Sequence, residues 1–194
     1  GGIPTATDYI TVYGKKPGWK PKRLERTDDM DESYKNPDND VDLWTSSDAS
    51  AAGAADHQGM VYGIQHPITG VMMYPTNGRH WGLSQQEVFE IMNQWTEYEL
   101  KDLDDAIERA RVCDLSTQEV RPGVMGIVLK KTLEESRIEA QSVYDRGQWP
   151  KFYFTNKGKG GIRKKTYITN VDGKLVTNLW MHSEVGHTDG AKKE

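Results

Sequence analysis

The sequence predicts a mixed α+β fold, in which short strands and hairpins alternate with several helices and long irregular loops. Two observations support this prediction. Short β-branched and aromatic runs are separated by turn residues, as in strands and hairpins. Two capping-box patterns, Ser84 to Glu87 and Thr132 to Glu135, precede amphipathic segments of helical period. The chain of 194 residues has the size of one domain with an appendage.

The first part of the chain combines a predicted strand with a long irregular segment. Residues 8–13 (DYITVY) are β-branched and aromatic, which predicts a buried strand. Residues 15–55 are rich in Pro, Asp, Asn and Ser and show almost no periodicity. Residues 60–65 and 71–74 then predict a hairpin with a turn at 66–70, and residues 76–79 predict another turn.

The second part of the chain alternates helices and strands. Apolar residues recur at helical spacing after Ser84, and a second helix is predicted at 100–113. A short strand at 127–129 precedes a helix that opens at Thr132 and ends at Gly147. The remaining elements are a strand at 151–155, a flexible loop at 156–161 (NKGKGG), and a strand or turn at 163–169.

Composition excludes several classes of protein. No apolar run approaches the roughly 20 residues that span a bilayer, and no signal-peptide pattern opens the chain. The single cysteine, Cys113, excludes an internal disulfide framework and a multi-cysteine zinc site. The histidines lack metal-ligand spacing, so no metal site is predicted. We therefore expect a cytoplasmic protein that does not enter the membrane.

The net charge of −4 hides an uneven distribution. Acidic residues dominate 87–119, whereas basic residues dominate 146–174, and a second basic set lies near the start at Lys15, Lys16, Lys20, Lys22, Arg23 and Arg26. Clustered basic residues can neutralise phosphates even when the total charge is negative. The distribution therefore keeps nucleic acid among the candidate partners.

Residues 34–40 (YKNPDND) are the first candidate binding segment. Asparagine can pair bidentately with adenine, and lysine can contact phosphate. The segment offers Lys35, Asn36 and Asn39 for these roles on a backbone stiffened by Pro37. The alternative interpretation is a run of Asx-turns that only holds a loop together.

The glycine-rich loop at 156–161 and the strand after it form the second candidate segment. Glycines let a backbone approach phosphate closely, and the neighbouring cations neutralise it. The candidate DNA contacts here are Lys157, Lys159, Arg163, Lys164 and Lys165. An ordinary solvated hairpin loop is the alternative. Arg79 is a further candidate, either as a guanine reader or as a structural arginine beside Trp81.

Several segments resemble, in the same order, the modification subunits of type III restriction-modification systems, which are site-specific adenine-N6 DNA methyltransferases found with phage relatives. The similarity rests on DYI-x-VY-x-K at 8–15, KNPDND at 35–40, and the paired P-x-TG and GR-x-W patterns near 67–81. It continues in RG with FYF at 146–154 and in the C-terminal LW, VG-x-T and KE residues. One departure is Val41-Asp42-Leu43, where the family usually has Pro-Arg-Gly.

The resemblance covers the DNA target-recognition region of such an enzyme. Neither the D-P-P-Y active-site tetrapeptide nor the F-x-G-x-G turn for S-adenosylmethionine occurs in the chain, so no catalytic residue and no cofactor is expected here. S-adenosylmethionine would belong to the parent enzyme. The implied organisation is the last strand of the catalytic sheet at 1–16, a recognition domain at 17–180 with a helical insertion at about 97–145, and a linker at 181–194.

The function implied by this resemblance is binding of double-stranded DNA for sequence selection, without chemistry in this chain. The parent enzyme would flip the target adenine into its own pocket. The alternative is a protein-interaction module, because the resemblance also implies a homodimeric parent that binds a restriction subunit. A stand-alone hydrolase has little support, since no Ser, His or Cys constellation has recognisable spacing.

Overall fold

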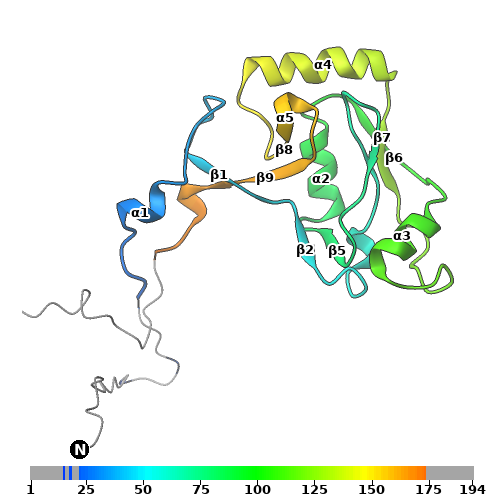
Figure 1. Cartoon of the computed structure of the whole chain (residues 1–194), viewed down its shortest axis with the longest axis horizontal. Coiled ribbons are helices and arrows are strands. Elements are labelled where there is room, and N and C mark those ends of the chain that lie inside the picture. Colours follow the sequence, from blue (N-terminus) through cyan, green and yellow to red (C-terminus); the bar gives the residue numbers. More distant parts are fainter. Residues whose placement is uncertain (1–14, 16–17, 19–21, 174–194) are drawn as a thin grey trace, which may run out of the picture. The chain divides into compact units, whose positions relative to one another are not determined.

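A computed structural model describes residues 15, 18 and 22–173 (Figure 1). The strand expected at 8–13 and the linker expected at 181–194 lie outside the described residues. The chain divides into two compact units, one formed by Gly1–Met30 with Asp172–Glu194 and the other by Asp31–Val171. In the first unit, Arg23 Nη1 donates to the Gly173 carbonyl at 3.2 Å. Among the described residues, the second unit contains nearly all the helices and strands.

Three small sheets organise the second unit. The first has the order β1-β9-β8, with β1 at Trp44–Asp48, β9 at Ile162–Tyr167 and β8 at Phe152–Phe154, all antiparallel. The second pairs β2 (Ser50–Ala52) with β5 (Arg79–Trp81). The third has the order β4-β3-β7-β6, in which β3 and β7 are parallel; its strands are β3 (Ile64–Gln65), β4 (Met72–Met73), β6 (Tyr98–Lys101) and β7 (Gly126–Leu129).

The helices begin where the capping boxes predict. In α2 (Gln85–Met92) the Ser84 side chain accepts from the Glu87 backbone amide, and in α4 (Leu133–Arg146) Thr132 accepts from Glu135 in the same way. The remaining helices are α1 (Asp28–Asp31), α3 (Ala106–Cys113), α5 (Thr155–Gly158), η1 (Gln58–Met60) and η2 (Ile168–Asn170). None of the helices in the described part of the chain is long and apolar enough to cross a membrane.

The hydrophobic core joins the β1-β9-β8 sheet to the β4-β3-β7-β6 sheet through α2. This helix contacts both β6 and β8, and Trp95 just after it donates its indole Nε1–H to the Phe152 carbonyl at 2.9 Å. The largest fully buried apolar side chains include Trp95, Tyr62, Phe152, Phe154, Ile64, Met92 and Ile127. Burial of these aromatic side chains compensates for the low apolar content of the chain.

The α+β class is confirmed, and both capped helices are present. The hairpin expected at 60–65 and 71–74 forms over the shorter strands β3 and β4, and the strands expected at 127–129 and 151–155 appear as β7 and β8. The turn expected at 76–79 is confirmed, because the Arg79 amide donates to the Thr76 carbonyl at 2.9 Å. Two expectations were wrong, and the first concerns the segment 15–55, which was expected to be irregular but contains β1 and β2.

The helix expected at 100–113 is interrupted: its first residues form β6, and the helix begins only at Ala106. Asp104, which lies after the end of β6 at Lys101, has a positive φ of 51°, a conformation that a right-handed helix does not contain, so the helix begins after it. Residues 97–145, expected to form a helical insertion around a short strand at 127–129, therefore also contain β6, and β7 lies between β3 and β6 in one sheet.

Candidate nucleic-acid interface

The antiparallel pair β1 and β9 lines up two sets of side chains on one face of its sheet. Because side chains alternate along strands, Trp44, Ser46 and Asp48 share a face, and their register partners are Tyr167, Lys165 and Arg163. The two ends of this face differ in burial. Lys165 lies in a closed, buried cluster, whereas Arg163 lies at an open, polar end.

The closed end holds a buried ion cluster of Asp38, Asp40, Lys165 and Tyr167. The Lys165 ammonium Nζ lies 2.5 Å from Asp38 Oδ2 and 2.6 Å from Asp40 Oδ2, and its side chain is fully buried. Tyr167 donates its hydroxyl to Asp40 at 2.7 Å. Partial burial raises the pKa of Asp40, but hydrogen bonds from Lys165 and Tyr167 outweigh this and lower it below its ordinary value. This cluster is a structural feature with its charges satisfied internally.

Asp38 connects this cluster to two further segments, at Trp44 and at Gln148 and Trp149. Its Oδ1 accepts from Trp44 Nε1 at 2.9 Å, and its Oδ2 accepts from the Trp149 backbone amide at 2.7 Å. Its own carbonyl accepts from the Gln148 amide at 2.6 Å. Gly147 makes this approach feasible, because a Cβ there would lie 2.4 Å from the Asp38 carbonyl oxygen and its φ is +80°.

Asn36 closes the loop that carries Asp38. Its amide Nδ2 donates to the Asp40 carbonyl at 2.7 Å, and its Oδ1 accepts from the Asp40 backbone amide at 2.6 Å. Both polar atoms of the side chain are therefore engaged within the loop. The Asx-turn interpretation of this segment explains its hydrogen bonds.

The open end holds an arginine cluster of Arg79, Arg163, Asp48, Ser46 and Ser50. Each arginine donates its Nε–H to one serine hydroxyl: Arg163 to Ser46 at 3.1 Å and Arg79 to Ser50 at 2.9 Å. Asp48 lies between the serines in sequence and forms an ion pair with Arg79 at 2.9 Å. The two arginines are far apart in the chain, and β9 and β5 bring them to neighbouring parts of the β1–β2 segment.

The carboxylate of Asp48 stays ionised in this cluster. Slight burial raises its pKa, but hydrogen bonds from the Ser50 amide and hydroxyl lower it more, and the charges of Arg79 and Arg163 act in the same direction. The cluster therefore carries two guanidinium groups and one carboxylate, with a net positive charge.

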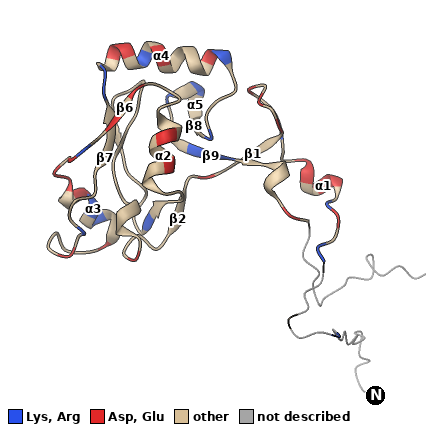
Figure 2. Cartoon of the chain, turned by 180° about the vertical axis from the view of Figure 1, so that it is seen from behind, with Lys and Arg blue, Asp and Glu red and all other residues tan. Residues whose placement is uncertain are grey.

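The α5 segment presents two further cations. The Thr155 backbone amide donates to the Gly161 carbonyl at 3.1 Å and so joins the two ends of the segment. Gly158 packs near Tyr144 and Ile68. Lys157 and Lys159 are exposed, and Lys157 has the left-handed φ of 54°. Figure 2 shows basic positions along β9 and at α5, acidic positions on α2, and positions of both signs on β6, α3 and α4.

The structure separates the predicted DNA contacts into accessible and inaccessible residues. Lys35, Asn39, Lys157 and Lys159 are exposed, and Arg79, Arg163 and Lys164 are half-buried. Lys164 lies on the face of β9 opposite to Arg163, because the two residues are adjacent in a strand.

Two predicted contacts need correction. Lys165 is buried and bound to two carboxylates, so its ammonium does not face a ligand. Asn36 is half-buried, and its amide nitrogen and oxygen each make one hydrogen bond within its own loop, so its observed contacts are structural. Residue type suggested a contact in both cases, but Lys165 is enclosed and Asn36 is engaged in holding its loop.

Sequence reasoning missed the residues that orient the arginines. Ser46, Asp48 and Ser50 recur at every second position, which is the period of a strand. That signal was available, but the polar and alanine-rich surroundings in 15–55 concealed it. Tyr153, which donates its hydroxyl to Ser46 at 2.7 Å, was also missed.

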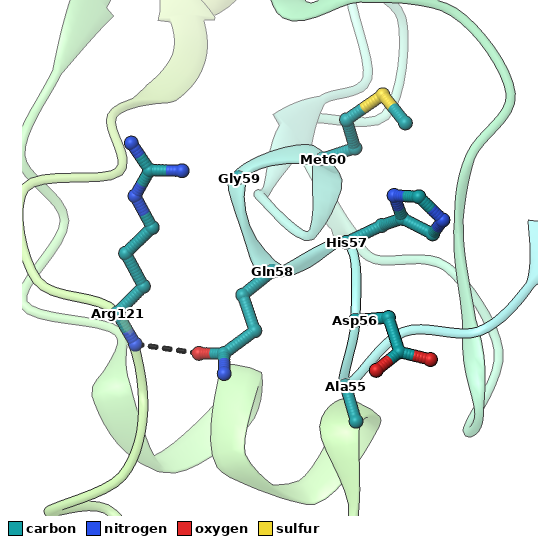
Figure 3. A pocket seen from close by; sticks show the side chains of 7 residues that line it. All are labelled: Ala55, Asp56, His57, Gln58, Gly59, Met60 and Arg121. Carbon is teal, nitrogen blue, oxygen red and sulfur yellow. Dashed lines mark hydrogen bonds between the residues drawn. The ribbon is translucent and has the colours of Figure 1, made fainter.

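A separate pocket is lined by Ala55–Met60 and by Arg121 (Figure 3). The Arg121 backbone amide donates to Gln58 Oε1 at 2.6 Å, while its guanidinium extends past Gly59. The ring of His57, another lining residue, lies 4.5 Å from that of His80. No group of three metal-ligating side chains occurs among the residues that the structure describes.

The chain was compared with protein-family models, curated proteins and solved structures, and no match was found in any of the three comparisons.

Proposed function

We propose that this chain is the DNA target-recognition region of a site-specific adenine DNA methyltransferase of the type III modification kind, and that it binds double-stranded DNA. The observation that carries the proposal is the convergence of segments behind the sequence resemblance. Asp38 of the KNPDND segment contacts Trp44, Trp149 and Lys165, which lie in three other parts of the chain.

This convergence gives the resemblance a physical basis. A segment whose residues hold distant strands together is constrained by its contacts, so the KNPDND segment, one of those that carry the resemblance, belongs to one framework with Trp149 and Lys165. That framework fixes β1 and β9, and these strands carry Ser46, Asp48 and Arg163 of the arginine cluster. The proposed DNA surface consists of the arginine cluster together with the exposed lysines of α5.

The charge of the two exposed lysines of α5 suits contact with a phosphate backbone. Lys157 and Lys159 are exposed, with no ion pair to a carboxylate among the described residues. Lysines of this kind neutralise phosphates and release counterions, which makes binding steeply salt-dependent. By contrast, Lys130 and Lys131, which follow β7 of the β4-β3-β7-β6 sheet, form ion pairs with Glu97.

The test is a fluorescence-anisotropy titration of a labelled duplex with the whole chain at several salt concentrations. We expect saturable binding, with affinity that falls linearly on a log–log plot against salt. The double variant Lys157→Ala/Lys159→Ala should bind all sequences more weakly and reduce the slope by about 1.8, because each phosphate contact contributes about 0.9.

The matched control is Lys101→Ala/Lys130→Ala, which removes the same charge from exposed residues at and near the third sheet. It should leave the slope within error of the wild type. If both double variants lost affinity and salt slope equally, DNA binding would depend on nonspecific charge attraction, which would contradict the proposed surface. Absence of DNA binding with salt-insensitive self-association would favour the protein-interaction module instead.

A further inference from the structure

The two guanidinium groups of the arginine cluster differ in how many of their nitrogens are engaged: Arg79 is bound at Nε and Nη2, and Arg163 at Nε alone. Arg79 donates Nε–H to Ser50 Oγ, and its Nη2 donates to both Asp48 Oδ2 and the Ser50 carbonyl. Arg163 donates only Nε–H, to Ser46 Oγ, so Nη1 and Nη2 have no hydrogen-bond partner among the described residues. Arg79 is thereby a structural clamp on β1 and β2, and Arg163 is available to a ligand.

The orientation of Arg163 is set by a chain of contacts from the core. Ser46 Oγ accepts from both Arg163 Nε and the Tyr153 hydroxyl. The Tyr153 ring packs 5.0 Å from Trp44 and 5.8 Å from Trp149, centroid to centroid, and Trp44 is itself held by Asp38. A guanidinium fixed at Nε presents its Nη1–Nη2 edge in a defined direction, which is the preorganisation that bidentate recognition requires.

Two ligand groups in DNA match that edge: the O6 and N7 acceptors of guanine, and two oxygens of a phosphate. The neighbouring carboxylate distinguishes them. Asp48, the register partner of Arg163, is 54% exposed. Its ion pair with Arg79 offsets part of its charge, but a carboxylate beside Arg163 still disfavours a phosphate there relative to an uncharged base edge. A guanine edge is uncharged, and a cytosine amino group in the same groove can donate to such a carboxylate.

We propose that Arg163 reads a guanine in the major groove of duplex DNA, with Ser46 and Tyr153 as positioning residues and with Arg79 and Asp48 holding the strand beneath it. This inference rests on the proposed function, because it presupposes that the chain binds DNA. It assigns base readout to Arg163 and phosphate contact to Lys157 and Lys159.

The experiment selects bound duplexes from a random-sequence pool and sequences them, using the wild-type chain, Arg163→Ala and Lys157→Ala/Lys159→Ala. The wild type should enrich a motif with guanine at one position. Arg163→Ala should lose the preference at that position alone, by about 5- to 150-fold. The double lysine variant should retain the whole motif with weaker binding.

A second arm replaces that guanine with 7-deazaguanine, which lacks the N7 acceptor. The modified base should weaken binding of the wild type and leave Arg163→Ala unchanged, because the same contact is already missing. An unchanged motif in Arg163→Ala would overturn the inference. A uniform loss over all sequences with a shallower salt slope would also overturn it, by identifying a phosphate contact.

The failure of this inference is distinguishable from failure of the proposed function. Binding of the wild type without any sequence preference overturns base readout by Arg163 and leaves DNA binding intact. Absence of DNA binding by the wild type overturns both. Arg163→Lys provides a further check, since a lysine keeps the charge but lacks the planar pair of donors and the Nε–H that Ser46 orients. This variant should bind DNA with a weaker guanine preference than the wild type.

Discussion

The two ends of the β1–β9 face use the same residue types for different purposes. At one end, Lys165 is enclosed with Asp38 and Asp40 and has no access to solvent. At the other end, two residues away in the same strand, Arg163 lies beside Asp48 with its Nη atoms open. The loop at 36–40 and Trp149 cover only the first end.

The difference shows that neighbouring basic residues with the same side-chain orientation need not share a role. Disruption of the buried ion cluster strongly destabilises the fold, because removal of one charged group leaves the others uncompensated in a desolvated site. The arginine cluster is solvated, so its individual contacts contribute little to folding. Measurements of folding stability and DNA binding therefore distinguish the structural role of the buried ion cluster from the binding role of the arginine cluster.

The largest effect on stability is expected from Lys165→Met, which leaves Asp38 buried without its cation. The free energy of unfolding should fall by about 3–5 kcal/mol, as for other broken buried pairs. Urea denaturation followed by tryptophan fluorescence would measure it. Lys164→Met is the matched control and should change the value by no more than about 0.5 kcal/mol. A small effect at Lys165 would contradict its structural role.

The next largest effect is expected from Gly147→Ala. The backbone at Gly147, with φ of 80° and ψ of −167°, lies in a region open almost solely to glycine. An added Cβ would also meet the Asp38 carbonyl oxygen at 2.4 Å. The strained backbone alone should lower the free energy of unfolding by about 1–3 kcal/mol, and the close contact with Asp38 should add to this loss. Gly161→Ala, which has open space around its Cβ, should have little effect in the same denaturation assay.

A smaller effect should appear in the pH dependence of stability. The folded-state pKa of Asp40 lies below its ordinary value of 3.8. Its ionisation therefore stabilises the fold above pH 3.8, and this contribution is lost as the pH falls through the folded pKa. Asp40→Asn should differ from the wild type most at neutral pH, with the difference shrinking in acid. A difference that does not depend on pH would show that the charge of Asp40 is unimportant.

The smallest stability effects are expected in the arginine cluster, and they should separate its two arginines. Arg79→Ala removes hydrogen bonds to Ser50 and the ion pair with Asp48, and should cost up to about 1 kcal/mol. Arg163→Ala should change unfolding by no more than about 0.5 kcal/mol. Thermal denaturation of both variants would compare them. Greater destabilisation by Arg163→Ala would assign the structural role to Arg163 instead.

Local patterns predicted most of the regular structure. The capping boxes at Ser84 and Thr132 located two helix starts because their hydrogen bonds involve residues close in sequence. The hairpin at 64–73 was predictable for the same reason. By contrast, β1 was missed because its partner β9 lies more than a hundred residues away, and its polar sequence WTSSD lacks a strong strand preference.

The candidate site was predicted in part. Arg79 and Arg163 were identified as basic residues, but their proximity depends on the pairing of β1 with β9 and of β2 with β5. The enclosure of Lys165 also depends on tertiary contacts, since Asp38 reaches it across 127 positions of sequence. Charge patterns report which residues could bind DNA, whereas non-local pairing decides which of them are accessible.

The most direct test of the account is a titration of duplex DNA followed through the arginine Nε–Hε resonances in NMR spectra of the labelled chain. The buried Arg109, which donates its Nε–H to the Val61 carbonyl at 2.9 Å, serves as an internal reference. We predict saturable shifts at Arg163 and unchanged signals at Arg109. Shifts confined to Arg111 and Arg121, or no shift at saturating DNA, would contradict the proposed interface.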